Sequence, residues 1–117
     1  MPDYYNYILR CADGTLYSGS TVDPHKRLAA HNAGRGGAYT RPRRPVRMIA
    51  LWQWPDKSAA MSAECRVKRL TREEKLALIA GKISLPEGKR LPSARLPKAE
   101  RARKNRASAA AENISKG

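Results

Sequence analysis

Apolar side chains occur along the chain in short runs separated by turn residues, which predicts a small domain of mixed strands and helices. Residues 5–11 and 15–19 are rich in aromatic and β-branched side chains and flank Ala12-Asp13-Gly14, which is typical of a β-hairpin. Residues 46–54 form a third apolar run. Its alternation predicts a strand with one face made of Val46, Met48, Ala50, Trp52 and Trp54.

Capping residues place the helices between and after these strands. Asp23 and Pro24 are suited to begin a helix that Gly34 ends. Ser58 is a suitable cap for a second helix over 58–70, and a Thr71/Glu74 capping box predicts a third over 71–79, ended by Gly81. The expected order is β-β-α-β-α-α, an α+β fold with a small three-stranded antiparallel or mixed sheet flanked by helices.

The hairpin turn allows two registers, because Asp-Gly suits both. A two-residue turn pairs Tyr7 with Ser20 and puts Tyr7 and Tyr17 on opposite faces. A three-residue loop with Gly14 left-handed places Leu9 opposite Tyr17 and both phenols on one face, turned toward Arg27. A shared chemical role for the two tyrosines requires the second register, which we therefore predict.

Composition changes after residue 81. All seven Tyr and Trp residues lie in 1–81, whereas 82–117 is mainly Lys, Arg, Ala, Ser and Pro. A segment with so few large apolar groups is not expected to offset its ordering entropy. We expect an ordered domain over 1–81 and a basic, disordered tail over 82–117, either binding a polyanion or only increasing solubility.

The charge of the chain indicates an anionic partner. There are 24 Lys and Arg against 10 Asp and Glu, a formal net charge of +14, and nucleic acid or an anionic membrane surface would balance it. The longest apolar run, 48–52, is far shorter than the ~20 residues of a membrane span, and the N-terminus lacks a secretory signal. We expect a cytoplasmic protein that binds nucleic acid and no membrane, with no obligate protein partner evident.

The cysteines and one of the histidines give no sign of a metal cluster. Cys11 and Cys65 lie in no CxxC or Cys/His pattern, so we expect both to be reduced, small core residues. His25 is six residues from His31, which puts their rings on different faces of a helix. We expect His25 at the surface.

A set of residues in order carries more specific information. Tyr5-Asn6-Tyr7 and Tyr17-Ser18-Gly19 are followed by Thr21, Asp23, Arg27 and His31, and then by residues 38–41 and Glu64 within 63–68. This set, over roughly 4–80, resembles the GIY-YIG nuclease domain. It is most similar to the short stand-alone bacterial members related to the N-terminal nuclease domain of the excinuclease C subunit. Tyr-Asn-Tyr and Tyr-Ser-Gly replace the family's Gly-Ile-Tyr and Tyr-Ile-Gly, and the asparagine many members carry after the metal-binding glutamate has no counterpart before Asn105.

The resemblance implies a metal-dependent endonuclease whose catalytic residues are Tyr7, Tyr17, Arg27, His31 and Glu64. Glu64, the implied ligand, is a hard oxygen donor suited to one Mg²⁺ or Mn²⁺ ion. Arg27 has the planar donor fork that fits phosphoryl oxygens, and His31 follows at i+4 on the same helix face. Taken alone, the same residues also fit a solvated arginine, a half-buried histidine and a surface carboxylate paired with Lys68.

The two tyrosines require a change in pKa to act as bases. A phenol with its ordinary pKa of ~10 must shift by about three units to act as general base at pH 7, and a divalent cation with Arg27 could provide that shift. We assign Tyr7 as the base and Tyr17 as the source of an orienting hydrogen bond. The sequence alone allows the reverse, or two core aromatics.

A glycine- and arginine-rich loop over 34–45 has the mixture that follows phosphates and stacks on bases. Its expected nucleic-acid contacts, with one from the helix of Glu64, are Arg35, Tyr39, Thr40, Arg41, Arg43, Arg44 and Lys68. A mobile, solvated loop is the alternative interpretation of this composition.

Three functions are compatible with the sequence. We predict an endonuclease that hydrolyses phosphodiester bonds in DNA, single-stranded or structured, and favour DNA over RNA. The alternative is a nucleic-acid-binding module that keeps the fold with little or no cleavage activity. A third possibility is an accessory protein whose basic tail docks on a ribosome or an acidic partner.

Overall fold

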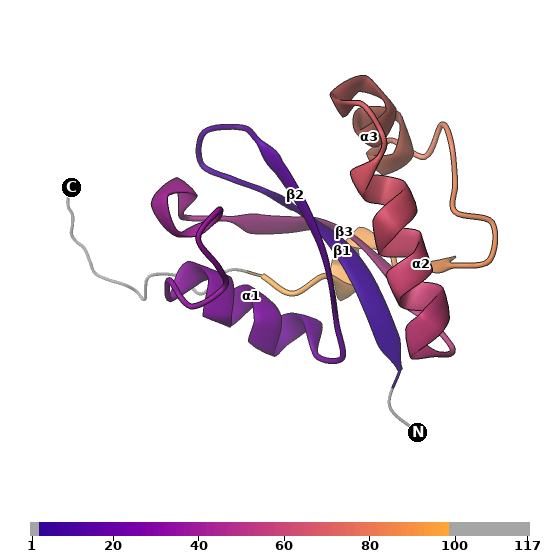
Figure 1. Ribbon diagram of the computed structural model, residues 1–117, viewed down its shortest axis with the longest axis horizontal. Coiled ribbons are helices and arrows are strands. Elements are labelled where there is room, and N and C mark those ends of the chain that lie inside the picture. Colours follow the sequence, from indigo (N-terminus) through magenta and orange to yellow (C-terminus); the bar gives the residue numbers. More distant parts are fainter. Residues whose placement is uncertain (1–2, 99–117) are drawn as a thin grey trace.

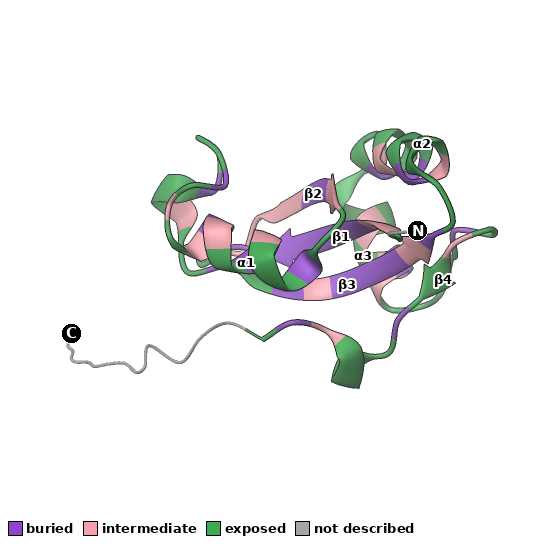
Figure 2. Ribbon diagram, turned by 90° about the horizontal axis from the view of Figure 1, so that it is seen from below, coloured by how far each residue is buried: buried purple, intermediate pink, exposed green. Residues whose placement is uncertain are grey.

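The computed structural model describes residues 3–98. Their strands form one antiparallel sheet in the order β2-β1-β3-β4, with α1 against one face and α2 and α3 against the other (Figures 1 and 2). The predicted α+β class is confirmed, and the sheet has four strands rather than three. The elements are β1 (Tyr4–Arg10), β2 (Leu16–Thr21), α1 (Pro24–Asn32), η1 (Arg41–Arg43), β3 (Arg47–Trp54), α2 (Lys57–Lys68), α3 (Arg72–Ile79), β4 (Lys89–Arg90) and η2 (Ser93–Arg95).

The first hairpin has the predicted three-residue loop. Leu9 pairs with Tyr17 and Tyr7 with Gly19, and Gly14 has φ 87°. The Gly14 N–H donates to the Cys11 carbonyl at 2.9 Å. The predicted register is confirmed, and Tyr7, Leu9 and Tyr17 all face α1.

The third strand does not keep its apolar residues on one face. Ile8 pairs with Ala50 but Leu9 with Met48, so β3 has one extra residue at Ile49, a β-bulge. Met48 therefore packs in the core beneath α1, whereas Ala50 packs in the core beneath α2 and α3. The prediction of a single apolar face is wrong, because the bulge reverses the alternation of the strand. The core beneath α1 contains Val46, Met48 and Leu51, and the core beneath α2 and α3 contains Ala50, Trp52 and Trp54.

Two of the three predicted helix starts are confirmed. Asp23 caps α1 by accepting from the Lys26 N–H at 3.1 Å, and Thr71 and Glu74 form the capping box of α3. The cap of α2 is Asp56, which accepts from the Ala59 N–H at 2.8 Å. The predicted cap, Ser58, lies inside the first turn instead. No helix within residues 3–98 is both long and apolar enough to cross a membrane.

Residues 82–98 pack on the domain, so the predicted boundary at Gly81 needs correction. The short strand β4 pairs with the edge of β3, and Leu85 and Leu91 are buried. Arg90 donates to the carbonyls of Leu78 and Ile79 at the end of α3. These two leucines and the edge strand hold residues 82–98 on the domain, although composition alone assigns them to the tail. The remaining residues of the predicted tail, 99–117, lie outside the described part.

The two cysteines occupy different environments. Cys11 is buried in the core beneath α1, as predicted, whereas Cys65 is exposed. The prediction fails for Cys65 because α2 turns Ala63 and Val67 toward the sheet and position 65 toward solvent. His25 is exposed, as expected.

Candidate functional site

Tyr7 lies at the centre of β1 and is fully buried. Its cross-strand neighbour is Gly19, where an added Cβ would lie 2.5 Å from Tyr7 Oη and 2.6 Å from Cζ. A side chain at position 19 would therefore displace the phenol. The glycine of Tyr17-Ser18-Gly19 makes room for the tyrosine of Tyr5-Asn6-Tyr7.

Two side chains contact the Tyr7 hydroxyl, and a third extends the chain of hydrogen bonds that begins there. Arg27 Nε donates to Tyr7 Oη at 3.3 Å, His31 Nε2 lies 2.9 Å from the same oxygen, and His31 Nδ1 lies 2.9 Å from Thr40 Oγ1. Since Arg27 can only donate, the phenolic proton is available to Nε2, and the Nδ1 proton then goes to Thr40. In this arrangement each of these donors has an acceptor.

Burial keeps both ring groups uncharged at neutral pH. Burial first, and then the charge of Arg27, lowers the pKa of His31 to about 4. Burial also raises the pKa of Tyr7, and the hydrogen bond and charge of Arg27 oppose this rise without cancelling it. The resting site holds a neutral phenol beside a neutral imidazole, so Arg27 alone does not produce the phenolate that a simple base would need.

Tyr17 reaches the site through ring contacts. Its ring packs edge-on to His31, with centroids 5.4 Å apart, and stacks on Tyr39 at 5.7 Å. The guanidinium of Arg43 lies 4.0 Å from the Tyr39 ring centroid. Tyr17 thus joins the basic loop to the Tyr7 site.

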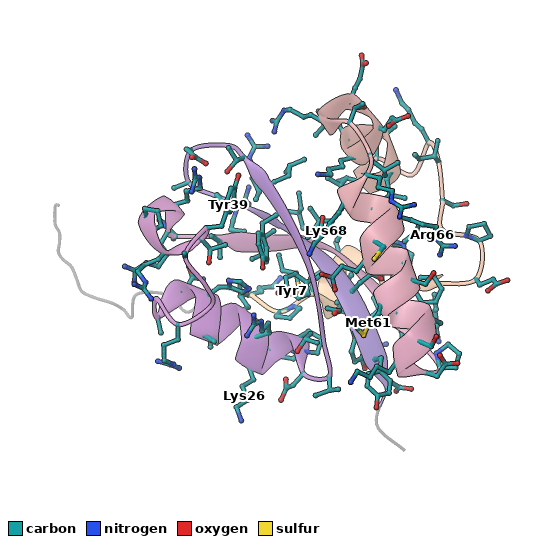
Figure 3. The ribbon with its side chains drawn as sticks, viewed as in Figure 1. Tyr7, Lys26, Tyr39, Met61, Arg66 and Lys68 are labelled. Atoms are coloured by element: carbon teal, nitrogen blue, oxygen red, sulfur yellow. The ribbon has the colours of Figure 1, made fainter. Side chains whose placement is uncertain are left out.

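Glu64 approaches from α2, on the other side of the edge strand β2. Ser20 Oγ donates to Glu64 Oε1 at 2.5 Å, and Lys68 Nζ lies 2.7 Å from Oε2. Burial raises the pKa of Glu64, but the bonds from Lys68 and Ser20 outweigh it and the net pKa is lowered. Figure 3 shows Lys68 on the side of α2 toward β2 and Arg66 on the opposite side. The lowered pKa means that the Glu64 carboxylate is ionised at neutral pH. Because Ser20 of β2 bonds to Glu64 of α2, the candidate site includes residues on both sides of β2.

The donors around Glu64 fit a hard divalent cation. Mg²⁺ binds through one or two carboxylates and keeps several waters or phosphate oxygens, and the Ser20 hydroxyl adds a second hard oxygen beside the carboxylate. The Lys68 side chain is 55% exposed, so it can move away from the carboxylate. Within residues 3–98, no three His, Cys, Asp or Glu side chains cluster as a metal site.

The structure assigns the predicted nucleic-acid contacts to several environments. Thr40 is buried and bonded to His31, so its predicted contact with nucleic acid is wrong; the loop folds back and turns it inward. Arg43 pairs with Asp13 at 3.2 Å. Arg35 and Tyr39 are exposed, and Lys68 pairs with Glu64.

Two residues of the site were missed by the sequence analysis. Ser20 could have been found by alternation, because it follows Gly19 and must face the opposite side, toward α2. Gly36 accepts from Arg27 Nη2 at 3.5 Å, and an added Cβ there would overlap the His31 ring. Its only sequence signal is its position in a glycine-rich loop.

Comparison with known proteins identifies the family. A family model described as the GIY-YIG catalytic domain matches residues 3–77. The chain belongs to this family. Tyr7, Tyr17, Arg27, His31 and Glu64 all lie within the GIY-YIG match.

Relatives of this GIY-YIG chain are short bacterial proteins named UPF0213. One from Streptococcus pyogenes serotype M5 is 56% identical over 77 residues, covering 65% of this chain and 84% of the relative. The protein YsiG of Lactococcus lactis is 49% identical over 80 residues, covering 68% and 77%. A solution NMR structure of a UPF0213 protein from Bacillus halodurans has 44% identity and a TM-score of 0.47 over 68% of this chain and 85% of that chain. These names state no activity.

Proposed function

We propose that the protein is a metal-dependent endonuclease that hydrolyses phosphodiester bonds, preferentially in DNA. The observation that carries the proposal is the Tyr7 hydroxyl held between Arg27 Nε and His31 Nε2. A buried phenol with both a fixed cation and a proton acceptor on its oxygen is suited to proton transfer. Membership of the GIY-YIG catalytic-domain family supports the same reaction class.

Tyr7 and His31 act together as the base. As the water oxygen bonds to phosphorus, its proton moves to Tyr7 Oη and the phenolic proton moves to His31 Nε2. The bond from phosphorus to the leaving oxygen breaks, and that oxygen takes a proton from solvent. The imidazolium, which is fully buried, then returns its proton to Tyr7 Oη, and the phenol releases the proton it took from the water as the product leaves. This relay fits the raised pKa of Tyr7, because no free phenolate has to form beforehand.

Arg27 stabilises charge at the reacting phosphate. Its Nε and Nη2 are held by Tyr7 and the Gly36 carbonyl, which fixes the plane of the guanidinium. The N–H groups left over can donate to phosphoryl oxygens as negative charge builds up. Tyr17 keeps the His31 ring in place by its edge-on contact.

Glu64, supported by Ser20, would hold the metal ion. When bound, a divalent ion supplies Lewis-acid stabilisation of a phosphoryl oxygen. Lys68 neutralises Glu64 in the present arrangement, and its release would free a cation to contact a neighbouring phosphate. Ser20 keeps the carboxylate oriented through its hydroxyl.

One feature favours a second function, a nucleic-acid-binding module with little cleavage. Both Glu64 oxygens already have partners, Ser20 and Lys68. If this ion pair persists on the substrate, the basic surface binds nucleic acid without hydrolysing it. Cleavage assays separate the two functions.

The deciding experiment compares Glu64→Gln with wild type on single-stranded DNA, duplex DNA and RNA, each with Mg²⁺, Mn²⁺ or EDTA. We expect cleavage to fall ~100-fold or more in Glu64→Gln, because the ligand is lost, while affinity changes little. Glu73→Gln, at an exposed carboxylate of α3, is the matched control. Unchanged cleavage by Glu64→Gln would remove Glu64 from the mechanism, and binding without cleavage by wild type would favour the binding module.

A further inference from the structure

Helix α1 lines a groove with the face opposite the one that carries Arg27 and His31. On this face lie His25, Ala29, Asn32 and Ala33, at the i, i+4, i+7 and i+8 spacing of one helix side. They form one wall of a groove of about 870 Å³, near the upper end of the ~300–1,000 Å³ typical of ligand pockets. Tyr7, Tyr17 and Glu64 do not line it.

The cations of the groove come from two further segments. Arg41 and Arg44 belong to the loop that follows α1, and Lys98 belongs to the last described residues, which run beside α1 (Figures 1 and 2). None of the described residues lining the groove is acidic. In the described part of the chain neither arginine forms an ion pair, so their charges are available to an anion.

Both arginines are held in place by backbone carbonyls. Arg41 Nε donates to Gly34 O at 3.1 Å, and Arg44 Nε donates to Arg41 O at 2.7 Å. These bonds order the guanidinium groups before a ligand arrives, which reduces the entropy lost on binding. N–H groups of each fork remain available for a ligand.

Apart from these cations and the polar His25 and Asn32, the lining of the groove is apolar. Small or rigid side chains line it between the cations, namely Ala29, Ala33, Pro42 and Pro45. Fixed cations around apolar walls suit a chain of phosphates joined by sugars better than a small hydrated anion. The net charge of +14 favours a polyanion in the same way.

We propose that this groove binds the phosphate backbone of nucleic acid as a second, non-catalytic site. The inference rests on the proposed function, because the occupant is the substrate or its product strand. The loop separates the two sites: Thr40 contacts His31 on the catalytic side, and the adjacent Arg41 lines the groove. Bound nucleic acid spans both sides of α1 and holds the loop between them.

The test measures binding of the full chain to short single-stranded and duplex DNA in EDTA, over about 50 to 200 mM salt. The groove variant carries Arg44→Gln and Lys98→Gln. The control variant carries Lys82→Gln and Lys89→Gln, two exposed lysines outside the groove, so the net charge falls equally. We expect the slope of log K against log salt to fall by ~1.4–1.8 in the groove variant alone, from ~0.7–0.9 for each lost contact.

A photocrosslinking residue provides a second measurement in case the groove variant misfolds, as judged by circular dichroism. Placed at Ala33, in the groove, it should crosslink to DNA, whereas at Ile83, an exposed residue outside it, it should not. Equal slopes of log K against log salt for both variants, or equal crosslinking at both positions, would contradict the proposal that the groove binds nucleic acid. If wild type cleaves DNA while the groove fails, the proposed function survives; if wild type binds no nucleic acid, both proposals fail.

Discussion

His31 is fully buried between Tyr7 and Thr40, and its ring hydrogen-bonds with both. Arg27 lies one helical turn earlier and also contacts Tyr7. Protonation of the ring would place a second positive charge beside that guanidinium, away from water. The burial that keeps His31 neutral therefore also makes the fold sensitive to acid.

We expect the free energy of unfolding to fall as the pH drops from ~6.5 to ~4. The pKa of His31 is lowered to about 4 in the folded state, so the unfolded chain binds more protons in this window and stability rises with pH. A shift of this size corresponds to about 3 kcal/mol. Denaturant titrations at several pH values measure it, and His31→Gln should flatten the dependence; an equally steep curve for the variant would assign the effect to other groups.

Several site residues could be predicted because their signals are local. Tyr7, Tyr17 and Gly19 lie in one hairpin, and the register followed from requiring both phenols on one face. Thr40 could not be placed in this way. A threonine among glycines and arginines is typical of an exposed loop, and only the folding of that loop onto α1 buries it against His31.

Among the elements, β3 shows where an alternation pattern fails. Residues 48–52 are all apolar, so no polar position marks which face a residue takes. Both sides of the strand are covered, by α1 on one side and by α2 and α3 on the other. Because both faces of the strand are apolar, the extra residue at Ile49 buries no polar group, whichever face each of its neighbours takes. The sequence therefore contains no polar position that would reveal the bulge.

The start of α2 offers a direct test at the same scale. We expect Asp56→Ala to lower the free energy of unfolding by ~1 kcal/mol, because it removes the acceptor of the Ala59 N–H. Ser58→Ala, inside the first turn, should change it by less than ~0.5 kcal/mol. Thermal or urea unfolding distinguishes them, and a larger effect at Ser58 would contradict the capping geometry.

For the molecule as a whole, residues 82–98 decide how far the fold extends. Sequence composition places them in a tail, yet they complete the sheet and contribute to both cores, Leu85 beneath α2 and α3 and Leu91 beneath α1. An added Cβ at Gly88 would lie 2.6 Å from the Trp54 ring, so the backbone passes directly over the indole. Such long-range packing depends on a few well-placed residues, which an average over the segment does not detect.

Two truncations test residues 82–98 and residues 99–117 separately. Ending the chain after Gly81 removes the buried Leu85 and Leu91, each worth ~1.5–3 kcal/mol, and exposes Trp52 and Trp54. We expect a loss of several kcal/mol in unfolding free energy and a shift in tryptophan fluorescence.

Ending the chain after Lys98 instead retains every contact described above and removes five basic and two acidic residues. That shorter chain should keep wild-type stability and bind DNA with a smaller salt dependence. Equal stability of the two truncated proteins would mean that β4 and its leucines contribute nothing to the fold, and an unchanged salt slope after Lys98 would mean that the last residues do not contact the phosphates.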